Sequence, residues 1–242
     1  MSKRTAVVTG GANGIGVAIV ARLKRDGFHV IALDISVPGT GAGAPDRFVQ
    51  VDLSDAGAAQ DVSARIAGEE QVSCLVNNVG IVAPASLEDV ALSDFDRLFA
   101  VNLRPSLICA QAFVPAMKAA GYGRIVMNTS RVTLGKELRS LYSATKGAAQ
   151  SMARTWALEL APFGITVNCV APGPIGTEAF WHNNPPNAPL TQAIIDRVPV
   201  KRMGTGDDVA NAVSFFCKEE TGFVTGQSLF VCGGVTVGLA GN

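Results

Sequence analysis

The stretch TGGANGIG, Thr9 to Gly16, places glycines between two different hydrophobic patterns. Residues 5–9 form a short apolar run, and residues 14–26 have the spacing of a helix. Glycines at a strand-to-helix turn permit a tight bend and let the backbone approach a pyrophosphate at the N-terminus of the helix. Taken alone, such a loop could be an ordinary turn. Its position after a strand and before a helix favours dinucleotide binding.

Short apolar runs alternate with helical patterns along the rest of the chain. We predict strands at 5–9, 29–34, 47–52, 73–78, 124–130, 165–170 and 228–232, and helices at 14–26, 55–68, 92–119, 141–161 and 207–218. The long helix at 92–119 contains Pro105, where it can divide into two. This alternation predicts βαβ units, and hence an α/β fold with a parallel sheet in a single domain covering 1–242.

One segment, at 172–200, interrupts this pattern. It is rich in proline, is expected to be irregular, and is followed by a short helical run. A long connection after the C-terminal end of a strand is a candidate substrate lid.

Composition limits the classes of partner. The chain has 242 residues, of which 48% are hydrophobic, and its formal net charge is zero. This balance argues against disorder and gives no electrostatic reason to expect nucleic acid or an anionic membrane as partner. No uninterrupted apolar run reaches the length of a membrane span, and the N-terminal residues do not resemble a signal peptide. The five scattered cysteines show neither a disulfide framework nor a metal-binding spacing, which favours reduced thiols and a cytoplasmic location.

Asp34 stands eighteen residues after Gly16, at the end of the second predicted strand. An acid at this place accepts hydrogen bonds from the adenosine ribose hydroxyls and repels a 2′-phosphate. No arginine or lysine lies between Gly10 and Gly16 or directly after Asp34. We therefore predict that NAD is preferred over NADP.

The stretch YSATK puts Tyr142 and Lys146 four residues apart in a predicted helix, so both lie on one face. A tyrosine must lose roughly 3 units of pKa, about 4 kcal/mol, to act as a base at neutral pH. An ammonium at about 4 Å supplies roughly 4 kcal/mol at an effective dielectric constant of 20. The pair could therefore move a proton. The same spacing is also common on ordinary helix surfaces, so the pair alone does not establish catalysis.

Together these motifs resemble those of the short-chain dehydrogenase/reductase family in its compact single-domain type, and the resemblance covers essentially the whole chain. The matching elements are TGGANGIG, VDL with Asp52, NNVG at Asn77–Gly80, VNL with Asn102, NTS with Ser130, YSATK, and PGPIGT at Pro172–Thr177. The resemblance implies a doubly wound, Rossmann-type sheet of seven parallel strands. It also implies hydride transfer between a nicotinamide cofactor and an alcohol/carbonyl pair, no resident metal, and a homotetramer.

The resemblance also implies roles for individual residues. Tyr142 would be the acid/base and Ser130 would donate to the substrate oxygen. Lys146 would lower the tyrosine pKa and hold the nicotinamide ribose, and Asn102 would support a water that links Lys146 to solvent. The implied cofactor-binding set is Gly10, Asn13, Gly14, Ile15, Gly16, Asp34, Asp52, Leu53, Asn78, Gly80, Tyr142, Lys146, Pro172, Gly173, Ile175 and Thr177.

Three positions depart from the family pattern. Ser130 lies twelve residues before Tyr142, one fewer than in most members, which leaves Thr129 and Ser143 as alternative hydroxyls. Val79 replaces an alanine, and Cys232 replaces an acid that often precedes two glycines.

The segment RVTLGKELRS, at 131–140, carries Arg131, Lys136 and Arg139 against one acid, Glu137. A guanidinium there could hold a substrate carboxylate, which would make a sugar acid or similar hydroxy carboxylate the substrate. We favour Arg139 over Arg131, because it precedes Tyr142 by about one helical turn. These cations could instead face solvent or a neighbouring subunit. Trp181 and His182, in the predicted lid, are further candidates for substrate contact.

Two other functions stay open. A 3-oxoacyl-thioester reductase would have similar motifs, although Asp34 counts against it because such biosynthetic reductases usually prefer NADP. A catalytically silent NAD-binding sensor is disfavoured by the intact Ser130, Tyr142 and Lys146.

Overall fold

A computed structural model describes residues 3–41 and 43–238 of the chain. These residues form one seven-stranded sheet in the order β3-β2-β1-β4-β5-β6-β7, and every neighbouring pair is parallel. The strands are β1 (Thr5–Thr9), β2 (His29–Asp34), β3 (Arg47–Gln50), β4 (Val72–Asn77), β5 (Gly123–Asn128), β6 (Ile165–Pro172) and β7 (Ser228–Val231). The predicted doubly wound α/β fold is confirmed.

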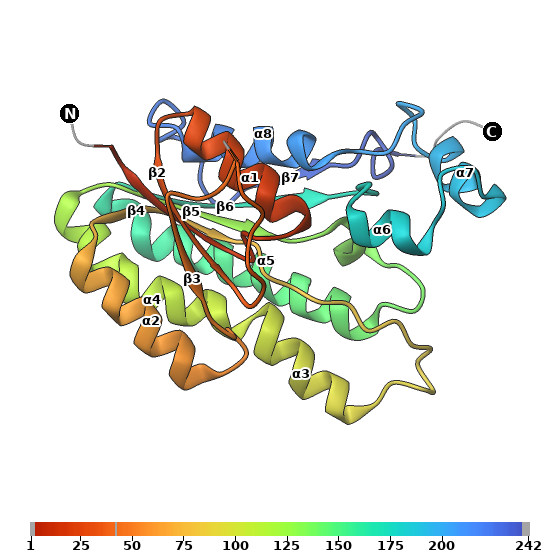
Figure 1. Ribbon diagram of the computed structural model, residues 1–242, viewed down its shortest axis with the longest axis horizontal. Coiled ribbons are helices and arrows are strands. Elements are labelled where there is room, and N and C mark those ends of the chain that lie inside the picture. The colour runs from red at the N-terminus through yellow and green to blue at the C-terminus, as the bar shows by residue number, and fades with distance from the viewer. Residues whose placement is uncertain (1–2, 42, 239–242) are drawn as a thin grey trace.

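Helices cover both faces of the sheet (Figure 1). One face packs against α1 (Gly14–Arg25) and α8 (Gly206–Cys217). The other face packs against α2 (Ala56–Glu69), α4 (Arg104–Ala120) and α5 (Ser140–Leu160), with α3 (Leu92–Asn102) beside α4 and α5. Two short 3-10 helices, η1 (Arg131–Leu134) and η2 (Ala161–Phe163), flank α5.

The strands supply apolar side chains to both layers. In β2, Ile31 and Leu33 join the core on the α2, α4 and α5 side, whereas Val30 and Ala32 join the core under α1 and α8. All four are fully buried. Successive side chains of a strand point to opposite faces, so a sheet covered on both faces requires the nearly continuous apolar runs seen in the sequence.

The long apolar stretch at 92–120 is divided into two helices. By length and composition alone, Leu92–Ala120 could cross a membrane. However, α3 ends at Asn102, Leu103 leaves helical geometry, and Pro105 occupies the first turn of α4, where its missing N–H costs nothing. Phe113 of α4 is completely buried in the core against the sheet. The α4 half of the stretch therefore packs in the core, and the predicted division near Pro105 is confirmed.

The insert at 172–200 is more regular than the sequence suggested. It contains α6 (Glu178–Asn183) and α7 (Pro189–Asp196), so the expectation of an irregular segment is wrong, whereas α7 supplies the short helical run that was expected after the proline-rich stretch. Thr177 caps α6 by accepting a hydrogen bond from the Phe180 N–H, and Pro189 begins α7 at a position where proline fits a helix. Both helices lie beyond the carboxyl end of β6 (Figure 1).

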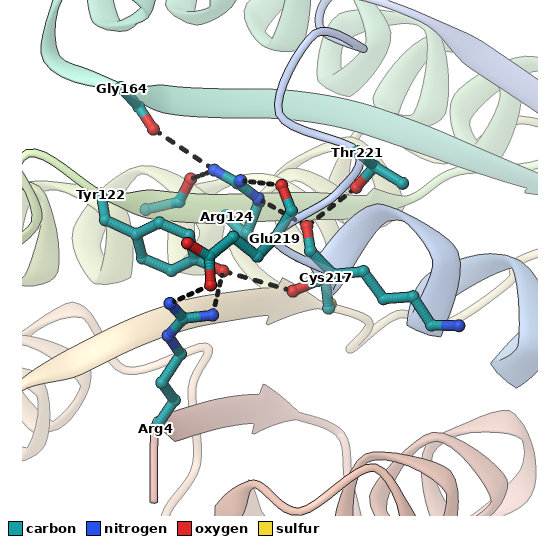
Figure 2. A network of polar contacts seen from close by, with 9 residues as sticks. Arg4, Tyr122, Arg124, Gly164, Cys217, Glu219 and Thr221 are labelled. Atoms are coloured by element: carbon teal, nitrogen blue, oxygen red, sulfur yellow. Dashed lines mark hydrogen bonds and ion pairs between the residues drawn. The ribbon is translucent and has the colours of Figure 1, made fainter. Parts of the chain in front are cut away.

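A buried arginine lies at the opposite, amino-terminal end of the strands (Figure 2). Arg124, at the start of β5, is 3% exposed. Its guanidinium stacks 4.3 Å from the ring centre of Tyr122, and Arg4 lies 4.1 Å from the same centre. Four backbone carbonyl oxygens accept hydrogen bonds from this guanidinium, those of Gly123, Gly164, Lys218 and Glu219. Two of them directly follow α8, so Arg124 fastens the end of that helix to the sheet.

Candidate active site

The glycine-rich loop joins β1 to α1 in a conformation that requires glycine. Gly10 has φ +65°, and a Cβ there would stand 2.9 Å from the Cα of Val79. A Cβ on Gly16 would collide with the carbonyl oxygen of Gly10. The side-chain amide of Asn78 donates to the carbonyl oxygens of Thr9, at 3.1 Å, and of Gly10, at 2.9 Å. Asn78, predicted from the sequence to bind the cofactor, thus braces this loop from the end of β4.

A cavity of about 1420 Å³ opens at the carboxyl edge of the sheet. Most of the residues predicted from the sequence line it: Gly10, Asn13, Gly14, Ile15, Asp34, Asp52, Leu53, Asn78, Gly80, Ser130, Arg131, Tyr142, Lys146, Pro172, Gly173, Ile175, Thr177 and His182. Four of the predicted residues do not line it: Gly16, Asn102, Arg139 and Trp181. The lining also contains residues that the sequence analysis did not assign, including Asn128, Lys136, Phe180, Ile194, Arg197 and Val235.

The two predicted adenosine-side acids are held by nearby backbone. The Asp34 carboxylate accepts hydrogen bonds from the Ala12 N–H at 2.9 Å and the Ser36 N–H at 3.0 Å. Asp52 accepts from both the backbone and the hydroxyl of Ser54. No lysine or arginine occurs among the cavity-lining residues at 34–36 and 51–54. This end of the cavity is therefore acidic and has its carboxylates already oriented.

Tyr142 and Lys146 share one face of α5, as their spacing predicts. The Lys146 Nζ lies 5.7 Å from the ring centre of Tyr142 and donates a hydrogen bond to the Asn128 carbonyl oxygen at 2.9 Å. Lys146 is 4% exposed, and burial lowers its pKa to about 8. Asn128 in turn donates from its side chain to the Asn78 Oδ1 at 2.7 Å. Asn128 therefore connects the ammonium to the residue that braces the glycine-rich loop.

The electrostatics of Tyr142 differ from the sequence-based expectation. Burial raises the pKa of the phenol, and a hydrogen bond with Ser130 and the charge of Arg139 lower it only in part. Lys146 does not contribute to the shift of the Tyr142 pKa, although the prediction from the sequence depended on its charge. Its ammonium is directed to the Asn128 carbonyl instead of to the phenol. In the chain alone, Tyr142 is therefore held in its protonated form.

The structure brings Ser130, and not its two alternatives, to Tyr142. Ser130 lines the cavity, and its interaction with the phenol lowers the pKa of Tyr142. Thr129 turns its hydroxyl to the carbonyl oxygen of Val170 at 3.0 Å, and Ser143 does not line the cavity. The shorter sequence spacing thus leaves the serine in reach of the tyrosine.

Asn102 lies behind the cavity wall. Its Oδ1 accepts from the Ile81 N–H at 2.8 Å, and its amide donates to the Ile81 carbonyl and the Thr145 hydroxyl. A Cβ on Gly80 would stand 3.4 Å from this Oδ1 and 3.2 Å from the Lys146 Nζ. Asn102 therefore ties the loop after β4 to α5, beside the ammonium, and Gly80 leaves the space between them open.

The first residues of the insert approach the glycine-rich loop. A Cβ on Gly14 would lie 3.6 Å from the Thr177 methyl. Gly173 packs so closely on Cys232 that a Cβ there would stand 2.6 Å from the Cys232 Cα. Trp181 stacks on Gly176 and not into the cavity, whereas its neighbour His182 lines it. Of the two predicted lid contacts, only His182 therefore faces the cavity.

Val79 and Cys232, the two other positions that depart from the family pattern, each contact neighbouring residues. Val79 is partly buried against the core on the α2, α4 and α5 side. The Cys232 Sγ lies 3.2 Å from the Thr236 hydroxyl. All five cysteines are buried and free. Among the described residues, no group of three or more His, Cys, Asp or Glu side chains is arranged to hold a metal ion.

Comparisons with known proteins agree with this geometry. A family model for enoyl-(acyl carrier protein) reductase matches residues 10–236. A hydroxy(phenyl)methylsuccinyl-CoA dehydrogenase subunit of Thauera aromatica is 35% identical, over 97% of this chain and 97% of that protein. A 3-oxoacyl-(acyl-carrier-protein) reductase of Rickettsia bellii is 31% identical, over 97% and 98%.

Solved structures are similar over the same length. A putative NAD(P)-dependent gluconate 5-dehydrogenase of Beutenbergia cavernae, with NADP bound at low occupancy, has a TM-score of 0.87. It is 34% identical, over 97% of both chains. The match extends over nearly the whole chain in both sequence and fold, and this chain belongs to the short-chain dehydrogenase/reductase family of oxidoreductases.

Proposed function

We propose that the chain is an NAD-dependent oxidoreductase that transfers hydride between a nicotinamide cofactor and the alcohol or carbonyl group of a small polar substrate. The observation that carries the proposal is that one cavity is lined both by the glycine-rich loop and by Ser130, Tyr142 and Lys146. The loop presents backbone at Gly10 and Gly14, and the N-terminus of α1 begins at Gly14, so the residues present fit a dinucleotide pyrophosphate.

Each catalytic side chain has a distinct task. In alcohol oxidation, Tyr142 as phenolate removes the hydroxyl proton, while Ser130 donates a hydrogen bond to the oxygen on which negative charge develops. A nicotinamide cofactor bound in this cavity would supply the hydride acceptor and, in its oxidised form, a positive charge. That charge offsets the burial that raises the pKa of Tyr142.

The remaining residues orient the reactants. Lys146 would hold the nicotinamide ribose, Asn102 supports the wall beside it, and Thr177 with the backbone near Ile175 would hold the carboxamide. Asp52, Leu53 and Gly80 complete the adenosine side. The preference for NAD rests on Asp34 and on the lack of lysine and arginine at 34–36 and 51–54 of the cavity lining. The similar gluconate 5-dehydrogenase structure contains NADP, so the cofactor has to be tested with both forms.

Among polar substrates we favour a hydroxy carboxylate such as a sugar acid, because the segment after Ser130 carries three cations against one acid. The experiment that tests the function is NADH formation against a panel of sugar acids, hydroxy acids, polyols and secondary alcohols. Turnover that persists unchanged in Tyr142→Phe would contradict the proposal.

The alternative is a 3-oxoacyl-thioester reductase. The Rickettsia bellii relative and the enoyl-reductase family model favour this second candidate. Oxidation of NADPH with acetoacetyl-CoA, faster than any alcohol oxidation with NAD, would support it. A silent NAD-binding sensor would bind NADH and turn over neither substrate class.

We also propose a homotetramer in the cytoplasm. Leu158 of α5 and Phe223, in the loop before β7, are exposed apolar side chains, and a hollow of about 430 Å³ lies between α5 and the loop before β7. These surfaces suit a second copy of the chain. Light scattering at micromolar concentration tests the assembly, and a monomer would contradict it.

A further inference from the structure

The segment between Ser130 and Tyr142 concentrates positive charge beside the reacting groups. Arg131, Lys136 and Arg139 lie within nine residues of chain, and none of them forms an ion pair within 4 Å in the described part of the protein. Glu137, the acid of the same segment, is exposed and does not line the cavity.

The three cations repel one another. Lys136 is an exposed residue whose ammonium is only partly desolvated; this partial desolvation lowers its pKa, and the charges of Arg131 and Arg139 lower it further. No neighbouring carboxylate raises the pKa of Lys136 in return. Like charges without a counterion destabilise the site that contains them, and an anion bound between them would relieve this repulsion.

The cations differ in position. Arg131 and Lys136 line the cavity, together with Ser130 and Tyr142. Arg139 does not line it; its guanidinium donates to the neighbouring Leu138 carbonyl oxygen, and its charge acts on Tyr142. The sequence favoured Arg139 for substrate binding, but in the structure Arg131 and Lys136 line the cavity and Arg139 does not.

The acids that line the cavity lie on other elements. Asp34 is the last residue of β2, Asp52 lies in the loop after β3, and Glu178 is the first residue of α6. Asp34 and Asp52 belong to the proposed adenosine side. Arg97 and Arg197 also line the cavity, but Arg131 and Lys136 are the cations of the segment that leads from Ser130 to Tyr142.

We propose that Arg131 and Lys136 together bind a carboxylate group of the substrate and so set its specificity. This inference rests on the proposed function and names its substrate class. Arg131 directly follows Ser130, so the bound anion lies within the length of a small molecule from the oxygen that Ser130 contacts. The phosphate of a thioester carrier is many bonds away from its reacting carbonyl, which favours a carboxylate on the same small molecule. Charge-assisted contacts then fix the carbinol carbon against Tyr142.

The test compares acids with neutral twins in which a hydroxymethyl group replaces the carboxylate. The pairs are D-gluconate with D-glucitol, lactate with propane-1,2-diol, and 3-hydroxybutyrate with butane-1,3-diol. 3-Hydroxybutyryl-CoA, as a separate arm, reports on a thioester carrier. The variants are Arg131→Gln, Lys136→Gln and the double variant. Arg65→Gln is the matched control, because Arg65 is exposed on α2 and has no ion pair among the described residues.

We expect each variant to raise KM for an accepted acid about tenfold or more, and to change KM for its neutral twin by no more than about twofold. Arg65→Gln should leave both unchanged, since an isolated exposed charge contributes little. Equal effects on acid and twin, a preference for neutral alcohols, or a loss confined to the CoA thioester would overturn the proposal.

Binding decides the question if turnover is too slow to measure. Calorimetry on the Tyr142→Phe protein saturated with NAD should show an acid of the panel binding more tightly than its twin, and Lys136→Gln in that background should remove the difference. If no acid binds more tightly than its twin, the proposal is wrong. A different result, unchanged turnover in Tyr142→Phe, would contradict the proposed function.

Discussion

The ammonium of Lys146 donates a hydrogen bond to the backbone carbonyl oxygen of Asn128 at 2.9 Å, while its Nζ remains 5.7 Å from the ring centre of Tyr142. The lysine is thus fixed by the end of β5. This contact explains how a cation can be kept in a buried position beside the tyrosine. Burial nevertheless makes the charge of Lys146 costly, and this cost has measurable consequences.

Replacing Lys146 with methionine should stabilise the protein at neutral pH. Burial lowers the pKa of Lys146 to about 8, whereas an unfolded lysine titrates near its ordinary value. Below about pH 8 both states are protonated and the folded state bears the cost of a buried charge, up to about 3 kcal/mol. Between about pH 8 and pH 10 the unfolded chain binds more protons, so wild-type stability rises with pH.

The advantage of Lys146→Met should therefore be largest near pH 7 and shrink as the pH rises through this window. The lost hydrogen bond to Asn128 reduces the gain by about 1 kcal/mol. Urea denaturation at several pH values measures the difference in free energy of unfolding between Lys146→Met and wild type, with the exposed Lys3→Met as control. A variant less stable than wild type at pH 7 would show that the lysine is not buried as a charge.

Replacing Tyr142 with phenylalanine should lower turnover at least about a hundredfold, because general acid/base groups contribute in this range. The cavity keeps its shape, so NADH should still bind, as fluorescence titration can show. Near-normal turnover would remove Tyr142 from the chemistry. Loss of NADH binding would mean that the variant had lost more than the phenol.

Asp34 should decide the cofactor. We expect kcat/KM at least about tenfold higher with NAD than with NADP, equivalent to about 1.4 kcal/mol. Asp34→Ser should narrow this ratio, because the carboxylate that repels a 2′-phosphate is gone. Since Asp34 also accepts from the Ala12 N–H, a melting curve must accompany the kinetics. Equal efficiency of wild type with both cofactors would contradict the interpretation of this residue.

Replacing Arg124 with methionine should destabilise the fold without altering the chemistry. Four carbonyl oxygens lose their donor, and a buried unsatisfied polar group costs about 1–3 kcal/mol, so a loss of roughly 2–4 kcal/mol is expected after relaxation and hydration. Urea unfolding checks the loss, and Arg65→Met on α2 is the matched control. A loss equal to that of the control would show that the network in Figure 2 does not hold α8 to the sheet.

The sequence by itself determined the layout of the chain. Strands buried on both faces must be almost wholly apolar, and helices covering them must be amphipathic, so the βαβ order could be predicted from periodicity. The glycine-rich loop could be predicted just as directly, since Gly10 takes a positive φ and a close contact that other residues do not tolerate. The neighbourhood of Tyr142 and Lys146 followed from helical spacing alone.

Only the tertiary structure decided where side-chain groups point and what their charges do. Asn128 was not assigned from the sequence because its contacts to Lys146 and Asn78 join residues far apart along the chain. The same is true of the pKa of Tyr142, which depends on the burial of the phenol and not on its distance in sequence from a lysine. The choice between Arg131, Lys136 and Arg139 also needed the fold, because spacing places a residue on an element but does not say which side of the cavity wall its charge occupies. Electrostatic energy depends on distance and burial in three dimensions, and neither can be read from position along the chain.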